Sequence, residues 1–213
     1  KGLLSPFDSL TSSIADPDWY DYARQLARLQ NSTFGIPFAG DTLALVYRPS
    51  LSGAAPGDWK SLLALSGPLV FPLADPQALC TLAIYLSSGG SVQDDQGRPS
   101  LNPAILTQVL AFYQQGAKQT LLPASIARIE TDDQAWQTYQ QNQATLSITW
   151  ASRYLDASGD QIKDMAAAPI PTLNGAPYSL ATGWVWALPN HRPDRQAIGV
   201  QLAEFLTQGS FLG

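Results

Sequence analysis

Cysteine and histidine are nearly absent from this sequence of 213 residues, and their scarcity excludes several kinds of chemistry. The one cysteine, Cys80, has no partner for an intramolecular disulfide, and its apolar neighbours Leu79 and Leu82 predict a buried, unreactive thiol. The one histidine, His191, lies in a turn-like Asn-His-Arg-Pro sequence. A cysteine–histidine pair or a zinc cluster needs more of these residues than the chain contains, so we expect no metal site and no cofactor.

Positive charge is also scarce. Lysine and arginine total 12 against 17 aspartates and glutamates, which gives a net charge of -5 and a pI near 4.6. The basic residues are scattered and form no patch, so the composition argues against a nucleic-acid partner. Charged residues make up only 14% of the chain and hydrophobic residues 45%, which is typical of a globular protein.

Long apolar runs are missing as well. No stretch approaches the ~18 consecutive apolar residues of a transmembrane helix, so we expect no membrane-spanning segment. Residues 1–6 lack a cationic region followed by a long apolar stretch and do not form a signal peptide. A mature or truncated chain would look the same, so this absence does not indicate a cytoplasmic protein.

Helix-start signals recur along the chain. Helices are expected to begin at Asp16, Asp75, Asn102, Thr131 and about Pro193. At the first three, a capping side chain precedes a proline, the residue preferred in the first helical turn. The first helix should carry apolar residues as far as Leu29, and the second should end at Gly89. The last carries Ile198, Leu202, Phe205 and Leu206 on one side.

Short apolar runs between these helices predict strands at 42–47, 68–71, 145–149, 165–170 and 182–188. Strands mixed with helices of this size indicate an α/β architecture. The segment 93–98 is expected to be a turn. A calcium loop is the alternative, but alternating acidic ligands and a closing glutamate are missing.

One segment carries a family signature. Residues 34–47, FGIPFAGDTLALVY, contain a Gly-x-Pro turn followed by a strand of the form Asp-x-Leu-x-Leu-x-Tyr. This segment resembles the signature of family 1 extracellular solute-binding proteins, the sugar-binding components of ABC transporters. Arg48 and Pro49 stand where the family commonly has Asn-Lys.

Three further segments resemble the family in the same order. Residues 56–63 resemble a tryptophan-containing helix start with Asp58 as its cap. Residues 135–150 resemble a helix, turn and strand that end at a ligand-side aromatic, although 142–146 replace the family's Gly-Lys-Ala-Ala-Met. Residues 169–184 resemble the return to the hinge. The ordered set covers nearly the whole chain and makes the resemblance specific.

The resemblance implies a two-lobed α/β fold of the periplasmic-binding-protein type II kind. Members are roughly twice as long, so the chain is expected to be a fragment that lacks N-terminal and C-terminal portions. By analogy, residues 1–40 lead from lobe one to the hinge, 41–184 form lobe two, and 185–213 return to lobe one.

The resemblance also implies residues that contact the solute. Asp41 takes the place of a carboxylate at the lobe crossover, with a strand cap as the alternative role. Trp150 ends a strand where the family presents a stacking aromatic, with core packing as the alternative. Gly183 and Trp184 lie at the return to the hinge, whereas Trp186 is expected to pack inside lobe one.

Gln77 and Arg153 complete the expected contacts. The family's maltose-binding member has a glutamate and a tyrosine near the place of Gln77 and Leu79, so this chain departs from maltodextrin recognition. Gln77 remains able to hydrogen-bond a hydroxyl group. Arg153 and Tyr154 follow Trp150 at the expected cleft rim, where ligand contact and simple surface placement are both open.

These implications predict an extracytoplasmic protein, in the periplasm or as a cell-surface lipoprotein, that passes a carbohydrate to the permease subunits of an ABC importer. The sugar would lie between two lobes, held by aromatic stacking and hydrogen bonds to its hydroxyls. One alternative is the same fold with a polyamine, phosphodiester or chelate as ligand, and another is a carbohydrate-active enzyme. An enzyme is not expected, because the adjacent Asp132 and Asp133 are better interpreted as helix-start residues than as a catalytic pair.

Overall fold

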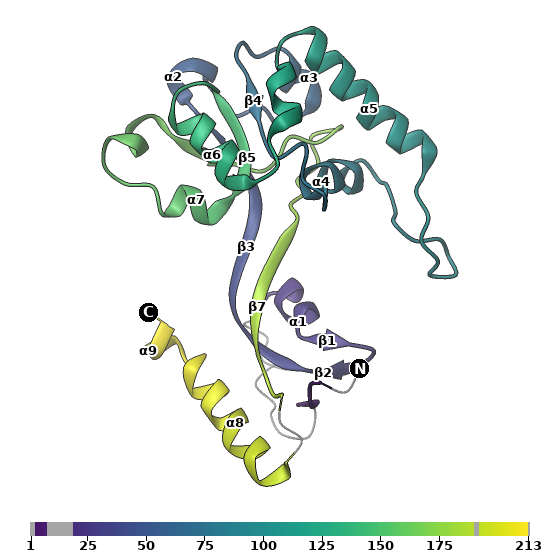
Figure 1. Cartoon of the computed structure of the whole chain (residues 1–213), viewed down its shortest axis with the longest axis vertical. Coiled ribbons are helices and arrows are strands. Elements are labelled where there is room, and N and C mark those ends of the chain that lie inside the picture. The colour runs from purple at the N-terminus through teal and green to yellow at the C-terminus, as the bar shows by residue number, and fades with distance from the viewer. Residues whose placement is uncertain (1–2, 8–18, 190–191, 213) are drawn as a thin grey trace. The chain divides into compact units, whose positions relative to one another are not determined.

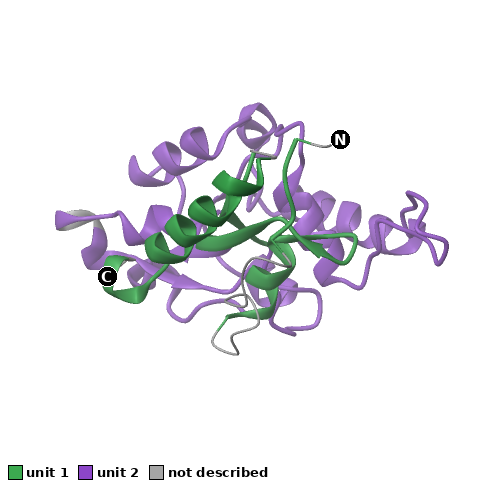
Figure 2. Cartoon of the chain, turned by 90° about the horizontal axis from the view of Figure 1, so that it is seen from below, with its two compact units in different colours: residues 1–41, 181–213 green, residues 42–180 purple. Residues whose placement is uncertain are grey.

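A computed structural model describes residues 3–7, 19–189 and 192–212 of the chain (Figure 1). These residues belong to two compact units, unit 1 with residues 1–41 and 181–213 and unit 2 with residues 42–180 (Figure 2). The chain therefore passes from unit 1 to unit 2 and back. The helix start expected at Asp16 and the turn around His191 lie outside the described residues.

Unit 2 is built on a mixed sheet with the strand order β4-β5-β3-β6. The strands are β3 (Gly35–Tyr47), β4 (Leu69–Val70), β5 (Leu146–Trp150) and β6 (Ala166–Ala168). Strand β4 runs parallel to β5, whereas β3 is antiparallel to both β5 and β6. The strands predicted in this part of the sequence are confirmed, with β3 beginning earlier than expected.

The helices of unit 2 lie on both faces of this sheet. They are α2 (Pro49–Ser52), α3 (Trp59–Leu63), α4 (Leu79–Ser87), α5 (Pro103–Lys118), η2 (Ala124–Arg128), α6 (Asp132–Gln140), α7 (Ala151–Leu155) and η3 (Gly159–Asp164). Because successive strand residues point to opposite faces, Leu45 and Ile148 pack in one apolar cluster with α3, α4 and α5. Val46 packs in a second cluster with Tyr139 of α6. Unit 2 is therefore a layered α/β domain, as predicted.

Three helices of unit 2, α3, α5 and α6, begin directly after a side chain that caps them. The Asn102 side chain accepts a hydrogen bond from the backbone nitrogen of Ala104 at 3.0 Å, as its position before a proline predicts. The helix start expected at Asp75 is wrong, because α4 begins only at Leu79. Ala78, directly before it, has a left-handed backbone with φ of 50° and ends a separate turn. Cys80 is 4% exposed in α4, which confirms the buried thiol.

Unit 1 contains fewer elements and a smaller core. Its elements are α1 (Asp21–Leu26), β1 (Arg28–Leu29), β2 (Ser32–Thr33), the first part of β3, β7 (Ala181–Ala187), α8 (Pro193–Leu206) and α9 (Gly209–Leu212). Strands β1 and β2 form an antiparallel ribbon, and β7 pairs with β3. The buried cluster of the described residues consists of Phe7, Ile36, Leu188, Val200 and Ala203.

Two expectations for unit 1 need correction. The first helix was expected to carry its apolar residues to Leu29, but α1 ends at Leu26 and Leu29 lies in β1. The reason is a tight turn in which Gln30 and Asn31 both have positive φ, and this geometry folds β1 back on β2. The last helix is confirmed as α8, yet its apolar Ile198 is 67% exposed while Val200 faces the core.

Candidate functional site

One edge of the unit 2 sheet brings several chain segments together. The carboxyl ends of β4 and β5 lie at the same edge because the strands are parallel. Leu43 of the antiparallel β3 pairs with Trp150, and its backbone nitrogen donates to the carbonyl oxygen of Leu180 at 2.9 Å. We call this the carboxyl edge. Open α/β sheets bind ligands at the carboxyl ends of their strands, so this edge is the candidate site.

Trp150 is the last residue of β5 and stands at the carboxyl edge. Its side chain is half-buried and packs against the larger apolar cluster of unit 2. The sequence analysis left core packing and ligand stacking open as roles for Trp150. In the structure its side chain contacts the core and is also partly exposed. A half-exposed indole held by a core is a rigid surface on which an apolar ligand face can stack.

Arg153 follows in α7, and carboxylates surround it. Its Nε donates to Oδ2 of Asp132 at 3.0 Å, and its Nη2 donates to Oδ1 of Asp133. The hydroxyl of Thr149 donates to the other oxygen of Asp132 at 2.7 Å. Desolvation lowers the pKa of Arg153, but hydrogen bonding to Asp132 and the two negative charges outweigh it, and the pKa is raised. We call Asp132, Asp133, Thr149 and Arg153 the Arg153 cluster.

Gln77 lies in the segment that follows the carboxyl end of β4. It is exposed, and its backbone nitrogen donates to Oδ1 of Asp75 at 2.9 Å. Burial raises the pKa of Cys80 to about 12, and the charges of Asp132 and Asp75 add to this rise.

Thr42 and Ser179 form a hydroxyl pair at the edge that the sequence analysis missed. The two side-chain oxygens are 2.5 Å apart, and the Ser179 hydroxyl also donates to the carbonyl oxygen of Leu43 at 2.6 Å. No local pattern marks these residues, because 137 positions separate them in the sequence. Only the return of the chain to the carboxyl edge brings them together.

Asp41, Gly183 and Trp184 fall in unit 1, whereas the sequence analysis included them in 41–184. Trp184 is 53% exposed on β7, and Asp41 is partly exposed on β3. Trp186 stacks on Phe38 with ring centroids 4.6 Å apart, as its expected packing role predicts.

Gly183 has a structural reason to be glycine. A Cβ atom at this position would lie 2.6 Å from the carbonyl oxygen of Ala39 and 2.6 Å from Cδ1 of Leu26. Strand β7 can approach β3 and α1 this closely only without a side chain at residue 183. The glycine therefore serves packing within unit 1.

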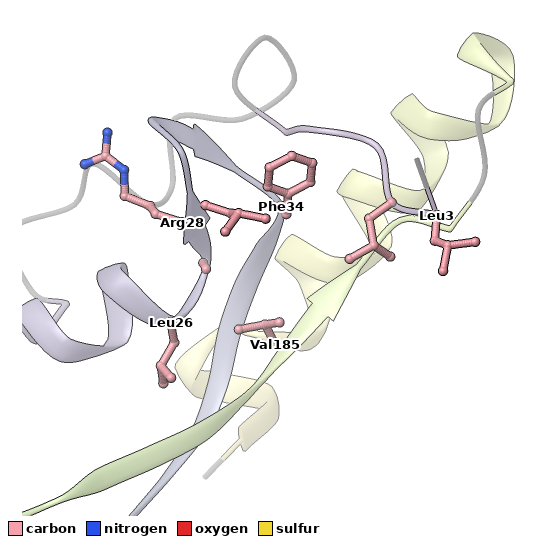
Figure 3. A pocket seen from close by; sticks show the side chains of 8 residues that line it. Leu3, Leu26, Arg28, Phe34 and Val185 are labelled. Carbon is pink, nitrogen blue, oxygen red and sulfur yellow. The ribbon is translucent and has the colours of Figure 1, made fainter. Parts of the chain in front are cut away.

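A separate cavity of about 540 Å³ lies in unit 1 (Figure 3). Its lining residues are Leu3, Leu4, Leu26, Ala27, Arg28, Leu29, Phe34 and Val185. None of the predicted contact residues lines it. Apart from Arg28 its side chains are apolar, so the cavity offers few hydrogen-bonding groups for a sugar.

Within the described residues, no cluster of histidine, cysteine, aspartate or glutamate is suited to hold a metal ion. In the turn considered as a calcium loop, Asp94 instead accepts hydrogen bonds from the Arg98 side chain at 2.7 Å and the Gln96 backbone at 2.9 Å. Among the residues that the structure describes, no helix is long and apolar enough to cross a bilayer.

The class of protein to which this chain belongs is shown by a match to a family. Residues 1–210 match the family described as bacterial extracellular solute-binding protein, and the chain belongs to this family. Members of this family are solute-binding proteins and not enzymes. The resemblance found in the sequence is therefore confirmed, as is the α/β periplasmic-binding-protein fold class.

Solved structures show the same fold. MalE3 of T. maritima with bound maltose has a TM-score of 0.81 at 18% identity, and the match covers 99% of this chain and 59% of that one. The GacH receptor of Streptomyces glaucescens has a TM-score of 0.77 at 17% identity, with coverage of 99% and 58%.

UgpB of Mycobacterium tuberculosis, solved with glycerophosphocholine, has a TM-score of 0.74 at 16% identity, with coverage of 99% and 59%. The chain thus spans less than two thirds of the length of these structures. Because the identities are low, the similarity shows a shared fold and no shared ligand. A search of the curated proteins finds no match.

Proposed function

We propose that this chain is part of the substrate-binding protein of an ABC importer, and that it binds a carbohydrate or related polyol. Family membership supports the solute-binding role. The observation that carries the ligand class is Trp150, a half-buried indole at the carboxyl edge. In this proposal unit 2 is lobe two and unit 1 belongs to lobe one.

The carboxyl edge has the two kinds of groups that a sugar requires. A pyranose presents flat faces of C–H groups, which stack on an aromatic ring, and a rim of hydroxyls, which need acceptors and donors. Trp150 supplies the ring. The amide of Gln77 and the hydroxyls of Thr42 and Ser179 supply neutral polar groups, and the Asp132 carboxylate supplies an acceptor. Asp41, Gly183 and Trp184 are proposed as further contacts from unit 1.

The biological setting follows from the family. The family is extracellular, and both a periplasmic protein and a cell-surface lipoprotein fit this description. The permease subunits of an ABC importer are the proposed protein partner, and no cofactor takes part in binding.

Binding is tested by thermal shift and calorimetry with maltose and ribitol, and with spermidine and glycerophosphocholine as non-sugar probes. A sugar at about a hundredfold excess over its dissociation constant should stabilise the folded chain by about 2.7 kcal/mol. Trp150→Ala should weaken that binding at least about tenfold, because it removes the stacking surface.

Trp186→Ala is the matched control, since it removes a tryptophan of unit 1 that is stacked on Phe38. Its effect on affinity should be small. A response to spermidine alone would replace the sugar with a polyamine, and equal losses in the two variants would reject Trp150 as the contact. Trp184→Ala tests the further contact proposed in unit 1.

A further inference from the structure

We infer that the Arg153 cluster determines ligand specificity: Asp132 and Asp133 occupy the Arg153 guanidinium, and the carboxyl edge therefore rejects phosphate-bearing solutes. This inference rests on the proposed function, because it concerns the same binding face. It matters because the solved structures of this fold include one with maltose and one with glycerophosphocholine. In this inference the negative charge of the cluster disfavours a phosphate-bearing ligand and tolerates an uncharged sugar.

Arginine is the side chain best suited to hold a phosphate, because its planar guanidinium donates two parallel hydrogen bonds. In this chain the Nε and Nη2 edge of the Arg153 guanidinium is already in use. Nε of Arg153 is bound to Asp132 at 3.0 Å, and Nη2 is bound to Asp133. A phosphate could use them only by displacing two carboxylates.

The cluster is held in place from several sides. The Asp132 side chain is 17% exposed, and its second oxygen accepts the hydroxyl of Thr149 at 2.7 Å. Thr131 caps α6 directly before it, with its side chain accepting from the Gln134 nitrogen at 3.3 Å. Partial burial and fixed partners strengthen an ion pair relative to a fully solvated one. The Asp132 carboxylate is therefore positioned to stay on Arg153 when a ligand arrives, whereas the Asp133 side chain is 77% exposed and is held less firmly.

The surrounding charge acts in the same direction. The single positive charge of Arg153 is matched by two carboxylates, those of Asp132 and Asp133. This surplus of negative charge repels a phosphate, whereas an uncharged polyol can donate its hydroxyls to a carboxylate oxygen.

The test is the double variant Asp132→Asn/Asp133→Asn of the full chain, in which asparagine preserves side-chain size but releases the guanidinium. Calorimetry measures the affinity for inorganic phosphate and for glycerophosphocholine in the wild type and the variant. We expect the variant to gain at least about tenfold in affinity for both, the effect of one new hydrogen bond between charged groups. Adding Arg153→Gln to the double variant should abolish this gain.

Asp94→Asn/Asp95→Asn is the matched control. It makes the same chemical change in the same unit and frees Arg98 from Asp94, which it contacts at 2.6 Å, without touching the carboxyl edge. This control should gain no phosphate affinity. An equal gain in the control would show a general charge effect and overturn the inference, as would an unchanged phosphate affinity in the Asp132→Asn/Asp133→Asn variant.

Sugar binding is measured separately with maltose, so that the two proposals fail in different ways. A chain that binds no sugar contradicts the proposed function, yet a phosphate gain that depends on Arg153 would still support the role of the cluster. A wild type that prefers glycerophosphocholine to maltose would overturn the role of the cluster and leave solute binding intact.

Discussion

The two units of this chain bury their apolar residues very differently. Unit 2 has apolar clusters on both faces of its sheet, with fully buried residues such as Leu146 and Tyr139 at their centres. In unit 1 the buried cluster of the described residues is small, and large apolar side chains such as Leu202 remain 56% exposed. Because burial of apolar surface is the main source of stability, unit 2 should be much the more stable.

Helix ends show the same contrast. In unit 2 the helices α3, α5 and α6 begin with a side chain that accepts a hydrogen bond from the first turn. In unit 1 the residues before α1 and α8 make no such bond. In unit 2 the residues before α2, α4 and α7 make no such bond either. Capping side chains stabilise a helix through its own sequence, so α3, α5 and α6 depend less on tertiary contacts than α1 and α8.

The largest expected effect comes from truncating a buried leucine in unit 2. Leu146→Ala should lower the free energy of unfolding of unit 2 by about 2–5 kcal/mol, because it leaves a cavity in the larger apolar cluster. Leu202→Ala in unit 1 removes the same atoms from an exposed position and should cost within about 0.5 kcal/mol. Urea unfolding followed by hydrogen exchange in each unit measures both, and equal losses would break the contrast.

A smaller effect is expected from a close contact in unit 1. Gly183→Ala forces a Cβ against the carbonyl oxygen of Ala39 and should destabilise unit 1 by about 1–3 kcal/mol. Gly209→Ala, in the same unit, places its Cβ where no atom lies within 4 Å, and it should leave stability nearly unchanged. Faster hydrogen exchange in β7 of the Gly183 variant alone is the expected readout. Equal exchange in both variants would mean that β7 adjusts to the added methyl group.

The smallest expected effect is a loss of stability at low pH through protonation of Asp58. Hydrogen bonds from the side chain and then the backbone of Ser61 lower the pKa of Asp58 below its usual 3.8. A carboxyl group with a lowered pKa in the folded state contributes stability above its unfolded pKa, and that contribution is lost as the pH falls through the folded value. Asp58→Asn keeps a good capping residue but removes the titration.

The difference in urea midpoint between wild type and Asp58→Asn should therefore be largest near neutral pH and should shrink below about pH 4. Hydrogen exchange in α3 assigns the loss to unit 2. A difference that stays constant down to about pH 3 would show that the Asp58 charge contributes nothing.

Much of the fold was predictable because its signals are local. Asn102 before a proline predicted the start of α5, and the alternation around Leu45 predicted a strand of the α/β layer. The buried state of Cys80 followed from its apolar neighbours. The boundaries that failed are those where backbone conformation overrides pattern, at Ala78 before α4 and at Gln30-Asn31 after α1.

The candidate site was predictable only in part. Trp150 was identified by resemblance, and the structure places it at the carboxyl edge. Arg153 was proposed as a contact without its partners, because Asp132 was interpreted only as a helix-start residue. Twenty-one positions separate the atoms of that ion pair in the chain, and no periodicity connects them.

By itself the sequence determined the family, the α/β class and the main helices and strands, because capping residues, apolar periodicity and short motifs act over a few neighbouring positions. Only the tertiary structure decided which side chains meet at the carboxyl edge. The pairing of β3 with β5 places Leu43 beside Trp150, and the return of the chain at Leu180 brings Ser179 to Thr42. Such contacts depend on the packing of distant segments, which no local pattern encodes.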